Sequence, residues 1–310
     1  MIKKHDMGHF EFSQTYGMFW DILEKSNRFL ENVIDNRKKP IDSRMNAWLF
    51  MKPIGDGGHF ANAAHIIDKY GVVPQEVMPE RHSSLDNKWL MNLVRTSLRR
   101  YGLKLREADV KDIQSVKEKA LADIYSILAH NLGLPPTEFE WTLKDKDGKV
   151  ISTRSYTPYS FRDEFIWHDL EKDYVIFMND STKPYYRMYR VENSRNCYEY
   201  ADWTFMNVPI GDILAMGVES LKNNTMFYFS ADTDASMLMM GGIYDVGLYD
   251  LGKDFGVSLD MTKEEKIRSC EIKSAHAIAM TGVQLGEDGE PVKWLVENSF
   301  GTVRGWDGYV

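Results

Sequence analysis

Two apolar stretches near the end of the chain each carry one polar side chain that is suited to proton transfer. His276 opens the stretch "HAIAMTGVQ", and Asn298 follows the stretch "KWLVE". An imidazole can take a proton from a nucleophile and return it to a leaving group. A side-chain carbonyl can hold that ring in one tautomer and one orientation. The pair therefore predicts two parts of a nucleophilic site, and a histidine with a purely structural role is the open alternative.

The turn between the two stretches decides whether these side chains meet. A two-residue turn at Asp288 and Gly289 would place them on opposite faces of a sheet, because side chains alternate along a strand. A loop of odd length or a β-bulge would place them on one face. The spacing alone leaves both arrangements open.

Apolar spacing and turn signals predict the elements that position these residues. Side chains at intervals of three and four predict helices over 14–35, 60–70 and within 86–134, with Trp89 in the buried stripe of the last. Ser13 is the predicted N-cap of the first helix, and Gly71 ends the second. Residues 139–143 and 150–156 predict a hairpin, strands are expected over 174–180 and 225–232, and residues 209–222 have helical spacing. Helices followed by strands predict an α+β fold.

Composition limits the classes of partner. Lysine and arginine number 38 against 46 aspartates and glutamates, and the net charge of −8 argues against nucleic acid. No apolar run is long enough to span a membrane, and "MIKKHDMGHF" lacks the apolar core of a signal peptide. The two cysteines, Cys197 and Cys270, favour a reducing, cytoplasmic location. No phosphate-binding or dinucleotide motif occurs in the sequence.

One short motif has the histidine spacing of a zinc site. In "HDMGH", His5 and His9 are four residues apart and Asp6 stands where zinc peptidases carry glutamate. Gly8 interrupts the helix that this arrangement needs, aspartate is one methylene shorter than glutamate, and no third ligand is evident. We predict a solvated helix end here and no metal.

Longer motifs resemble those of papain-like cysteine peptidases. The segments "SAHAIAMTGV", "VENSFG" and "GWDGYV" are similar to the histidine and asparagine segments of that family, and "GDGGHFANAAHIIDKYGVVPQEVMPE" is similar to its Gly-Gly loop and following helix. The segments "FEFSQTYGMFWD" and "LGLPPTEFEW" narrow the resemblance to the bleomycin hydrolase or aminopeptidase C branch. The resemblance implies a two-lobed fold, with a helical lobe and an antiparallel β lobe.

The resemblance also assigns roles to single residues. It implies that His276 is the general base and acid and that Asn298 orients it. It implies that Gly57, Gly58 and Ala275 bind substrate, the two glycines through backbone groups that pair with an extended peptide. An ordinary tight turn is the alternative explanation of the glycine pair. Phe300 stands where the family has tryptophan over the asparagine–histidine bond.

The expected organisation follows the same resemblance. A helical lobe is expected over 1–80, a family-specific insertion over 81–200, and a β lobe with His276 and Asn298 over 201–310. The implied function is a cytoplasmic, cofactor-free aminopeptidase that acts on peptides. The homo-hexameric assembly of the family is left open for this chain.

The nucleophile of the family lies on a helix upstream of "EFSQTY", and the printed chain begins only a few residues before that segment. We therefore expect the catalytic helix to be missing and the chain as printed to be inactive. The family also continues past the "GY" segment into a C-terminal arm, and we expect this arm to be missing because the printed chain stops at Val310. Neither Cys197 nor Cys270 is expected to form a thiolate–imidazolium pair. Two hypotheses remain open: a truncated peptidase, or a non-catalytic relative that binds peptides or associates with subunits.

Overall fold

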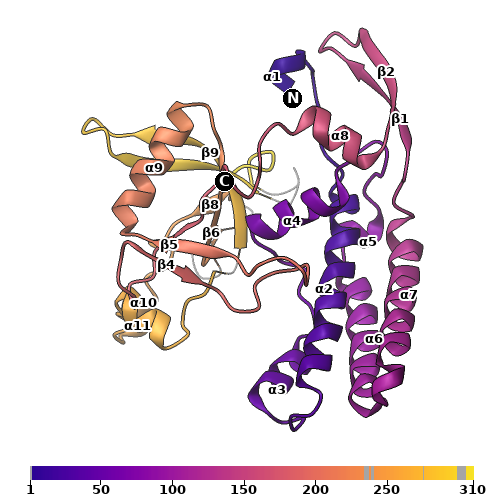
Figure 1. Cartoon of the computed structure of the whole chain (residues 1–310). Coiled ribbons are helices and arrows are strands. Elements are labelled where there is room, and N and C mark those ends of the chain that lie inside the picture. Colours follow the sequence, from indigo (N-terminus) through magenta and orange to yellow (C-terminus); the bar gives the residue numbers. More distant parts are fainter. Residues whose placement is uncertain (1, 234–236, 239–240, 275, 299–304) are drawn as a thin grey trace. The chain divides into compact units, whose positions relative to one another are not determined.

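The computed structural model describes residues 2–233, 237–238, 241–274, 276–298 and 305–310 (Figure 1). The chain forms two compact units. Unit 1 comprises Met1–Tyr174 and Glu192–Trp203, and unit 2 comprises Val175–Val191 and Thr204–Val310. The regions predicted as helical lobe and insertion fall mainly in unit 1, and the predicted β lobe falls almost entirely in unit 2. The predicted boundaries at residues 80 and 200 remain predictions.

Unit 1 is built mainly from helices. The α-helices are α1 (Ile2–His5), α2 (Gln14–Asn36), α3 (Arg44–Met51), α4 (Phe60–Tyr70), α5 (His82–Leu85), α6 (Lys88–Glu107), α7 (Ile113–Leu132) and α8 (Pro158–Phe165), and a 3-10 turn, η1 (Val110–Asp112), precedes α7. Helix α2 contacts α3, α4, α6 and α7 (Figure 1). It therefore forms the centre of this unit, and its buried side chains contribute to the largest apolar core of the described residues.

The predicted ends of α2 and α4 are confirmed. The Ser13 hydroxyl accepts a hydrogen bond from the Tyr16 N–H at 3.0 Å, which satisfies a donor of the first helical turn. Helix α4 ends at Gly71, whose φ of 73° lies in the left-handed region. The predicted burial of Trp89 is wrong, because its side chain is 70% exposed. The apolar stripe of α6 that faces the core runs through Leu90, Val94 and Leu98.

A hairpin completes unit 1. Strands β1 (Phe139–Lys144) and β2 (Val150–Tyr156) pair antiparallel, as predicted from the sequence. Trp141 and Tyr156 extend from this hairpin into a second apolar cluster, where Phe161 and Phe165 of α8 pack against them. The cluster is rich in edge-to-face aromatic contacts, which favour a defined packing.

Unit 2 contains short strands and three helices among its described residues. The strands are β3 (Phe177–Met178), β4 (Arg187–Arg190), β5 (Thr204–Asn207), β6 (Phe227–Ala231), β7 (Met237–Leu238), β8 (Ile243–Tyr244), β9 (His276–Leu285) and β10 (Pro291–Glu297), and the helices are α9 (Ile210–Lys222), α10 (Leu251–Phe255) and α11 (Lys263–Arg268). Sheet orders are β3-β5-β4, β10-β9-β6 and β7-β8. The expected antiparallel pairing holds except between β3 and β5, which run parallel.

Among the described residues, no helix combines the length and the apolar character that a membrane span needs.

Candidate functional site

His276 and Asn298 meet within unit 2. His276 is the first residue of β9, and Asn298 directly follows β10, its neighbour in the sheet. The Nε2 atom of His276 lies 3.0 Å from the Oδ1 atom of Asn298. An amide oxygen only accepts, so this contact places a proton on Nε2 and leaves the lone pair of the neutral ring on Nδ1. The arrangement matches a base whose tautomer is set by its neighbour.

A loop of odd length, residues 286–290 between the paired Leu285 and Pro291, lets the two side chains share a face, and two register shifts that cancel preserve this arrangement. The register of β9 and β10 shifts twice, once between Pro291 and Lys293 and once between Leu295 and Val296. The second shift leaves Thr281 of β9 unpaired and reverses the effect of the first on side-chain direction. Continuing from the pair of Glu297 and Ala279 brings Asn298 level with residue 278, two positions from His276 and on its face. The structure thus selects the one-face arrangement that the spacing left open.

Tyr244 fixes the other end of the Asn298 amide. The Nδ2 atom of Asn298 donates to the Tyr244 hydroxyl at 2.6 Å. Burial raises the pKa of Tyr244, while the hydrogen bond from Asn298 lowers it. With Nδ2 engaged by Tyr244, Oδ1 faces His276. Tyr244 was not among the predicted site residues, because it lies 54 residues from Asn298 and no motif marks it.

The glycine pair lies in unit 1, in the loop before α4. Gly57 and Gly58 are both exposed, and neither has a positive φ. A Cβ atom built on Gly57 meets nothing within 4 Å, and one on Gly58 meets only the Asn62 side chain, at 3.5 Å or more. A tight turn that requires glycine therefore does not explain this pair. Close approach of another chain is a remaining reason for glycine at such positions.

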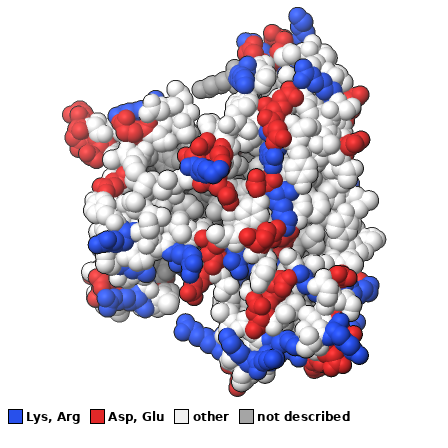
Figure 2. Space-filling view, viewed as in Figure 1, with Lys and Arg blue, Asp and Glu red and all other residues white. Residues whose placement is uncertain are grey.

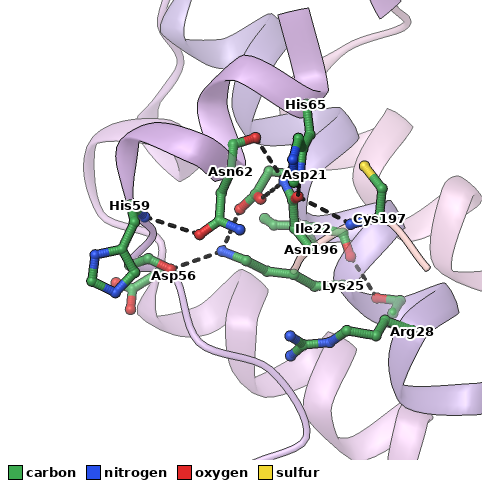
Figure 3. Close-up of polar contacts among 12 residues, drawn as sticks. Asp21, Ile22, Lys25, Arg28, Asp56, His59, Asn62, His65, Asn196 and Cys197 are labelled. Carbon is green, nitrogen blue, oxygen red and sulfur yellow. Dashed lines mark hydrogen bonds and ion pairs between the residues drawn. The ribbon is translucent and has the colours of Figure 1, made fainter. Parts of the chain in front are cut away.

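Buried polar groups hold this glycine loop (Figure 3). The Nζ atom of Lys25, on α2, donates to the Gly57 carbonyl at 2.8 Å and forms an ion pair with Asp21 at 2.5 Å. The His59 N–H donates to Oδ1 of Asn62, on α4, at 2.9 Å. Both Lys25 and Asn62 are buried. The loop is therefore tied to two helices on either side of Gly58.

The segment 192–203 joins these two helices. Asn196 donates through Nδ2 to Asp21 at 3.0 Å and to the Asn62 carbonyl at 2.9 Å. Asn62 in turn donates to the Ser194 carbonyl at 2.9 Å. Figure 3 shows Asn196 between the two helices. These residues were missed from the sequence, since asparagines far apart in the chain carry no pattern that predicts contact.

The two cysteines differ in their surroundings. Cys197 is buried in unit 1, where burial and the nearby Glu24 carboxylate raise the pKa of its thiol well above the ordinary range. Cys270 is exposed in unit 2 and follows the C-terminal end of α11. Catalytic thiolates are stabilised at helix N-termini or beside cations, and neither residue has the N-terminal position.

Four further residues were singled out from the sequence: Ala275, Phe300 and the two histidines of the zinc-like motif. Ala275 and Phe300 lie outside the described residues. His5 packs edge-on against Phe165, with ring centroids 5.7 Å apart, and His9 lies 3.6 Å from Glu11. The two histidines of the zinc-like motif thus have different partners.

Comparison with known proteins identifies the family. The model of the Peptidase C1-like family matches residues 1–310. The chain belongs to this peptidase family. Among curated relatives of this C1-like chain, aminopeptidase C of Lactobacillus delbrueckii subsp. lactis is 33% identical, with 99% of this chain and 70% of the relative aligned. Bleomycin hydrolase of Rattus norvegicus is 31% identical, with 100% of this chain and 71% of the relative aligned.

A solved structure agrees with these relatives. The crystal structure of PepW from Lactobacillus rhamnosis HN001 is 36% identical to this C1-like chain, with a TM-score of 0.94 over 99% of this chain and 70% of PepW. The predicted resemblance to the bleomycin hydrolase and aminopeptidase C group is confirmed.

Proposed function

We propose that this chain provides the proton shuttle and the peptide-binding loop of a cysteine-type aminopeptidase that removes N-terminal residues from peptides. The contact that carries the proposal is the 3.0 Å hydrogen bond between His276 and Asn298, with Tyr244 behind the amide. His276 would take the thiol proton during acylation and deliver it to the leaving amine, and it would then activate water to release the acyl group. The names of the relatives, aminopeptidase C and bleomycin hydrolase, support this class of reaction.

The glycine loop supports the same proposal from the substrate side. Gly57 and Gly58 occupy an exposed loop whose backbone conformation does not itself require glycine. The open space around the Cβ position of Gly57 would admit an extended peptide that pairs with backbone groups. The proposed substrate is therefore an extended peptide bound mainly through its main chain.

The proposed nucleophile lies outside residues 1–310. Cys197 is a poor candidate because its raised pKa keeps it as a thiol, and Cys270 is not at a helix N-terminus. The absence of a suitable thiol among the described residues also supports a second candidate function, a non-catalytic relative that binds peptides. Both candidate functions use the glycine loop to bind a peptide. Only the first includes cleavage of the peptide bond by a thiol nucleophile.

A turnover assay separates the two candidates. We expect no hydrolysis of alanine 4-nitroanilide or of dipeptide amides by the 310-residue chain. We expect hydrolysis by a longer polypeptide that includes upstream in-frame codons for a cysteine, and we expect iodoacetamide to abolish it. Alkylation-sensitive hydrolysis by the 310-residue chain itself would show that Cys197 or Cys270 is the nucleophile. If the longer polypeptide binds peptides without cleaving them, the second candidate function holds.

A further inference from the structure

We infer that His65 is a protonation switch within unit 1, whose charged ring holds the turn at residues 169–173 and whose neutral ring releases it. His65 lies on α4, and its side chain is 6% exposed. The inference is independent of the proposed peptidase chemistry, because it concerns a pH-dependent restraint on one segment of unit 1.

Both ring nitrogens of His65 face an acceptor. The Nδ1 atom lies 3.2 Å from Oδ1 of Asn196, and the Nε2 atom lies 3.0 Å from Oε1 of Glu171. An amide oxygen and an ionised carboxylate only accept hydrogen bonds. A neutral imidazole carries a single N–H and satisfies one of these contacts, whereas an imidazolium donates to both. The geometry therefore corresponds to a positively charged ring.

The Asn196 amide cannot turn over to relieve this requirement. Its Nδ2 group donates to Asp21 at 3.0 Å and to the Asn62 carbonyl at 2.9 Å, and its Oδ1 atom accepts from the Cys197 N–H at 3.0 Å. A rotation of the amide by 180° would lose all three bonds. Asn196 is fully buried, so bulk water cannot replace them. Figure 3 shows His65 next to this amide.

The surroundings of the ring favour a cation. The charged and titratable groups around it lie on α2, α4, the turn and the segment 192–203, and they are Asp21, Lys25, Asp68, Lys69, Glu171, Cys197, Glu199 and Tyr200. Burial raises the pKa of Cys197 and of Tyr200, so both stay neutral. Lys25 and Lys69 are each paired with carboxylates. Carboxylates thus outnumber ammonium groups, and a positive ring offsets the excess negative charge.

Loss of the proton should break the contact with Glu171 and keep the contact with Asn196. Asn196 is buried and bonded on both sides of its amide, so it cannot move away from a lone pair on Nδ1. The Glu171 side chain is 49% exposed and belongs to a turn, so its carboxylate can move into water at little cost. The remaining proton therefore stays on Nδ1, and the lone pair of Nε2 then repels the Glu171 carboxylate.

The turn has few other attachments to unit 1. Among the residues that the structure describes, its other hydrogen bonds and ion pairs are made within residues 168–173. A single turn of this length is marginally stable by itself in water. The turn ends directly before Tyr174, the last residue of unit 1 before the chain enters unit 2. The charge on His65 therefore sets how firmly this exit segment is tied to unit 1.

Two variants fix the switch in its opposite states. His65→Asn places an amide N–H near the position of Nδ1, so it keeps the bond to Asn196, never carries a charge and releases the turn at every pH. Glu171→Gln accepts from the charged ring and donates to the neutral ring, so it holds the turn at every pH. His168→Asn is the matched control, because His168 is an exposed histidine beside the same turn, 3.5 Å from Asp173.

Two NMR readouts are measured on the full chain at about pH 6 and about pH 9, on either side of the ordinary range of histidine. Nitrogen-15 shifts of the His65 ring, assigned by correlation with its own backbone, should show two protonated nitrogens at the lower pH and a proton on Nδ1 at the higher pH. Carbon-13 order parameters of the Cα–H vectors of residues 170–172 should fall from about 0.85 to below about 0.6 in the wild type. They should be low at both pH values in His65→Asn, high at both in Glu171→Gln, and unchanged from the wild type in His168→Asn.

Each other result would overturn the switch. A neutral ring at about pH 6, or a proton on Nε2 at about pH 9, would contradict the state assigned to His65. Order parameters that do not change with pH in the wild type would show that the ring does not restrain the turn. A pH dependence that persists in His65→Asn, or disappears in His168→Asn, would belong to another group. The wild type and Glu171→Gln decide the question even if His65→Asn does not fold, since both keep the buried ring.

Discussion

The side-chain amide of Asn298 makes a hydrogen bond from each of its two ends. Its Nδ2 group donates to Tyr244 at 2.6 Å, and its Oδ1 atom faces His276 Nε2 at 3.0 Å. A rotation of the amide by 180° would turn an N–H group toward the protonated Nε2 atom and lose that bond. The Tyr244 hydroxyl both donates and accepts, so it restrains the position of the amide and does not by itself select between the two orientations. The tautomer of His276 therefore depends on Tyr244 through the firmness with which the Asn298 amide is held.

Tyr244→Phe tests this dependence. Without the hydroxyl, the amide loses one hydrogen bond, worth about 1 kcal/mol, which is about a fivefold change in an equilibrium constant. We expect the ring of His276 to shift from the Nε2-protonated tautomer toward a mixture, and Asn298→Ala to produce a larger shift in the same direction. Nitrogen-15 NMR of the imidazole ring at about pH 8.5, above the ordinary titration range of histidine, measures the populations.

Tyr249→Phe serves as the control, because Tyr249 is an exposed tyrosine of the same unit. The signal of His276 is assigned by its disappearance in His276→Gln. An unchanged tautomer ratio in both Tyr244→Phe and Asn298→Ala would mean that the amide does not set the state of the ring.

At the scale of elements, glycines with different roles can be told apart by their surroundings. Gly71 ends α4 with φ of 73°, and a Cβ atom there would lie 2.3 Å from the Pro158 carbonyl oxygen. That carbonyl accepts a hydrogen bond from the Val72 N–H at 3.1 Å, so the two backbone segments are held together at this point. Gly57, in contrast, has open space around the same position. Packing therefore requires glycine at position 71 and does not require it at position 57.

Gly71→Ala and Gly57→Ala should therefore differ in stability. We expect Gly71→Ala to lower the free energy of unfolding by about 3 kcal/mol, since it combines backbone strain with overpacking. Gly57→Ala should change it by less than about 0.5 kcal/mol. Urea denaturation followed by circular dichroism measures both. If Gly57→Ala proved as destabilising as Gly71→Ala, the fold itself would require that glycine and its proposed role in binding would lose its support.

Much of the element order was encoded locally and could be predicted. Helix α2 begins after Ser13 and α4 ends at Gly71, because caps and left-handed glycines act on neighbouring residues. The prediction failed for Trp89, since apolar spacing does not reveal which residues at the edge of a stripe meet a partner. The register of β9 and β10 was also undetermined, because the bulge at Thr281 has no sequence signal.

At the scale of the whole chain, the predictable part of the site is the part that family motifs mark. His276, Asn298 and the glycine pair stand in such motifs, whereas Lys25 and Asn196 do not. Asn196 contacts Asp21 across 175 residues of sequence, and that pairing exists only after the chain has folded.

The net charge of −8 follows from the sequence, but the distribution of the charged side chains over the surface does not. Figure 2 shows acidic and basic side chains interspersed over the face that it draws.

Stability of the folded chain should depend on pH through His59. Burial lowers the pKa of His59, and the positive charge of Lys25 lowers it further. The ring of His59 also packs against Trp203, with centroids 4.7 Å apart. The folded state therefore favours neutral His59, while the unfolded chain takes up a proton near the ordinary value of about 6.5. Because the unfolded state binds more protons below that value, stability is complete above it and declines as the pH falls through it.

His59→Phe should make this decline shallower, because phenylalanine keeps a ring against Trp203 and cannot be protonated. Lys25→Met should act in the same direction and more weakly, since it removes only the second cause of the lowered pKa. Urea midpoints between about pH 8 and pH 5.5 measure the slope, and this window lies above the ordinary range of carboxylates. Comparison at about pH 8, where His59 is neutral in both states, separates any packing effect of the substitution. An equal or steeper decline in His59→Phe would mean that other groups govern the acid sensitivity of the fold.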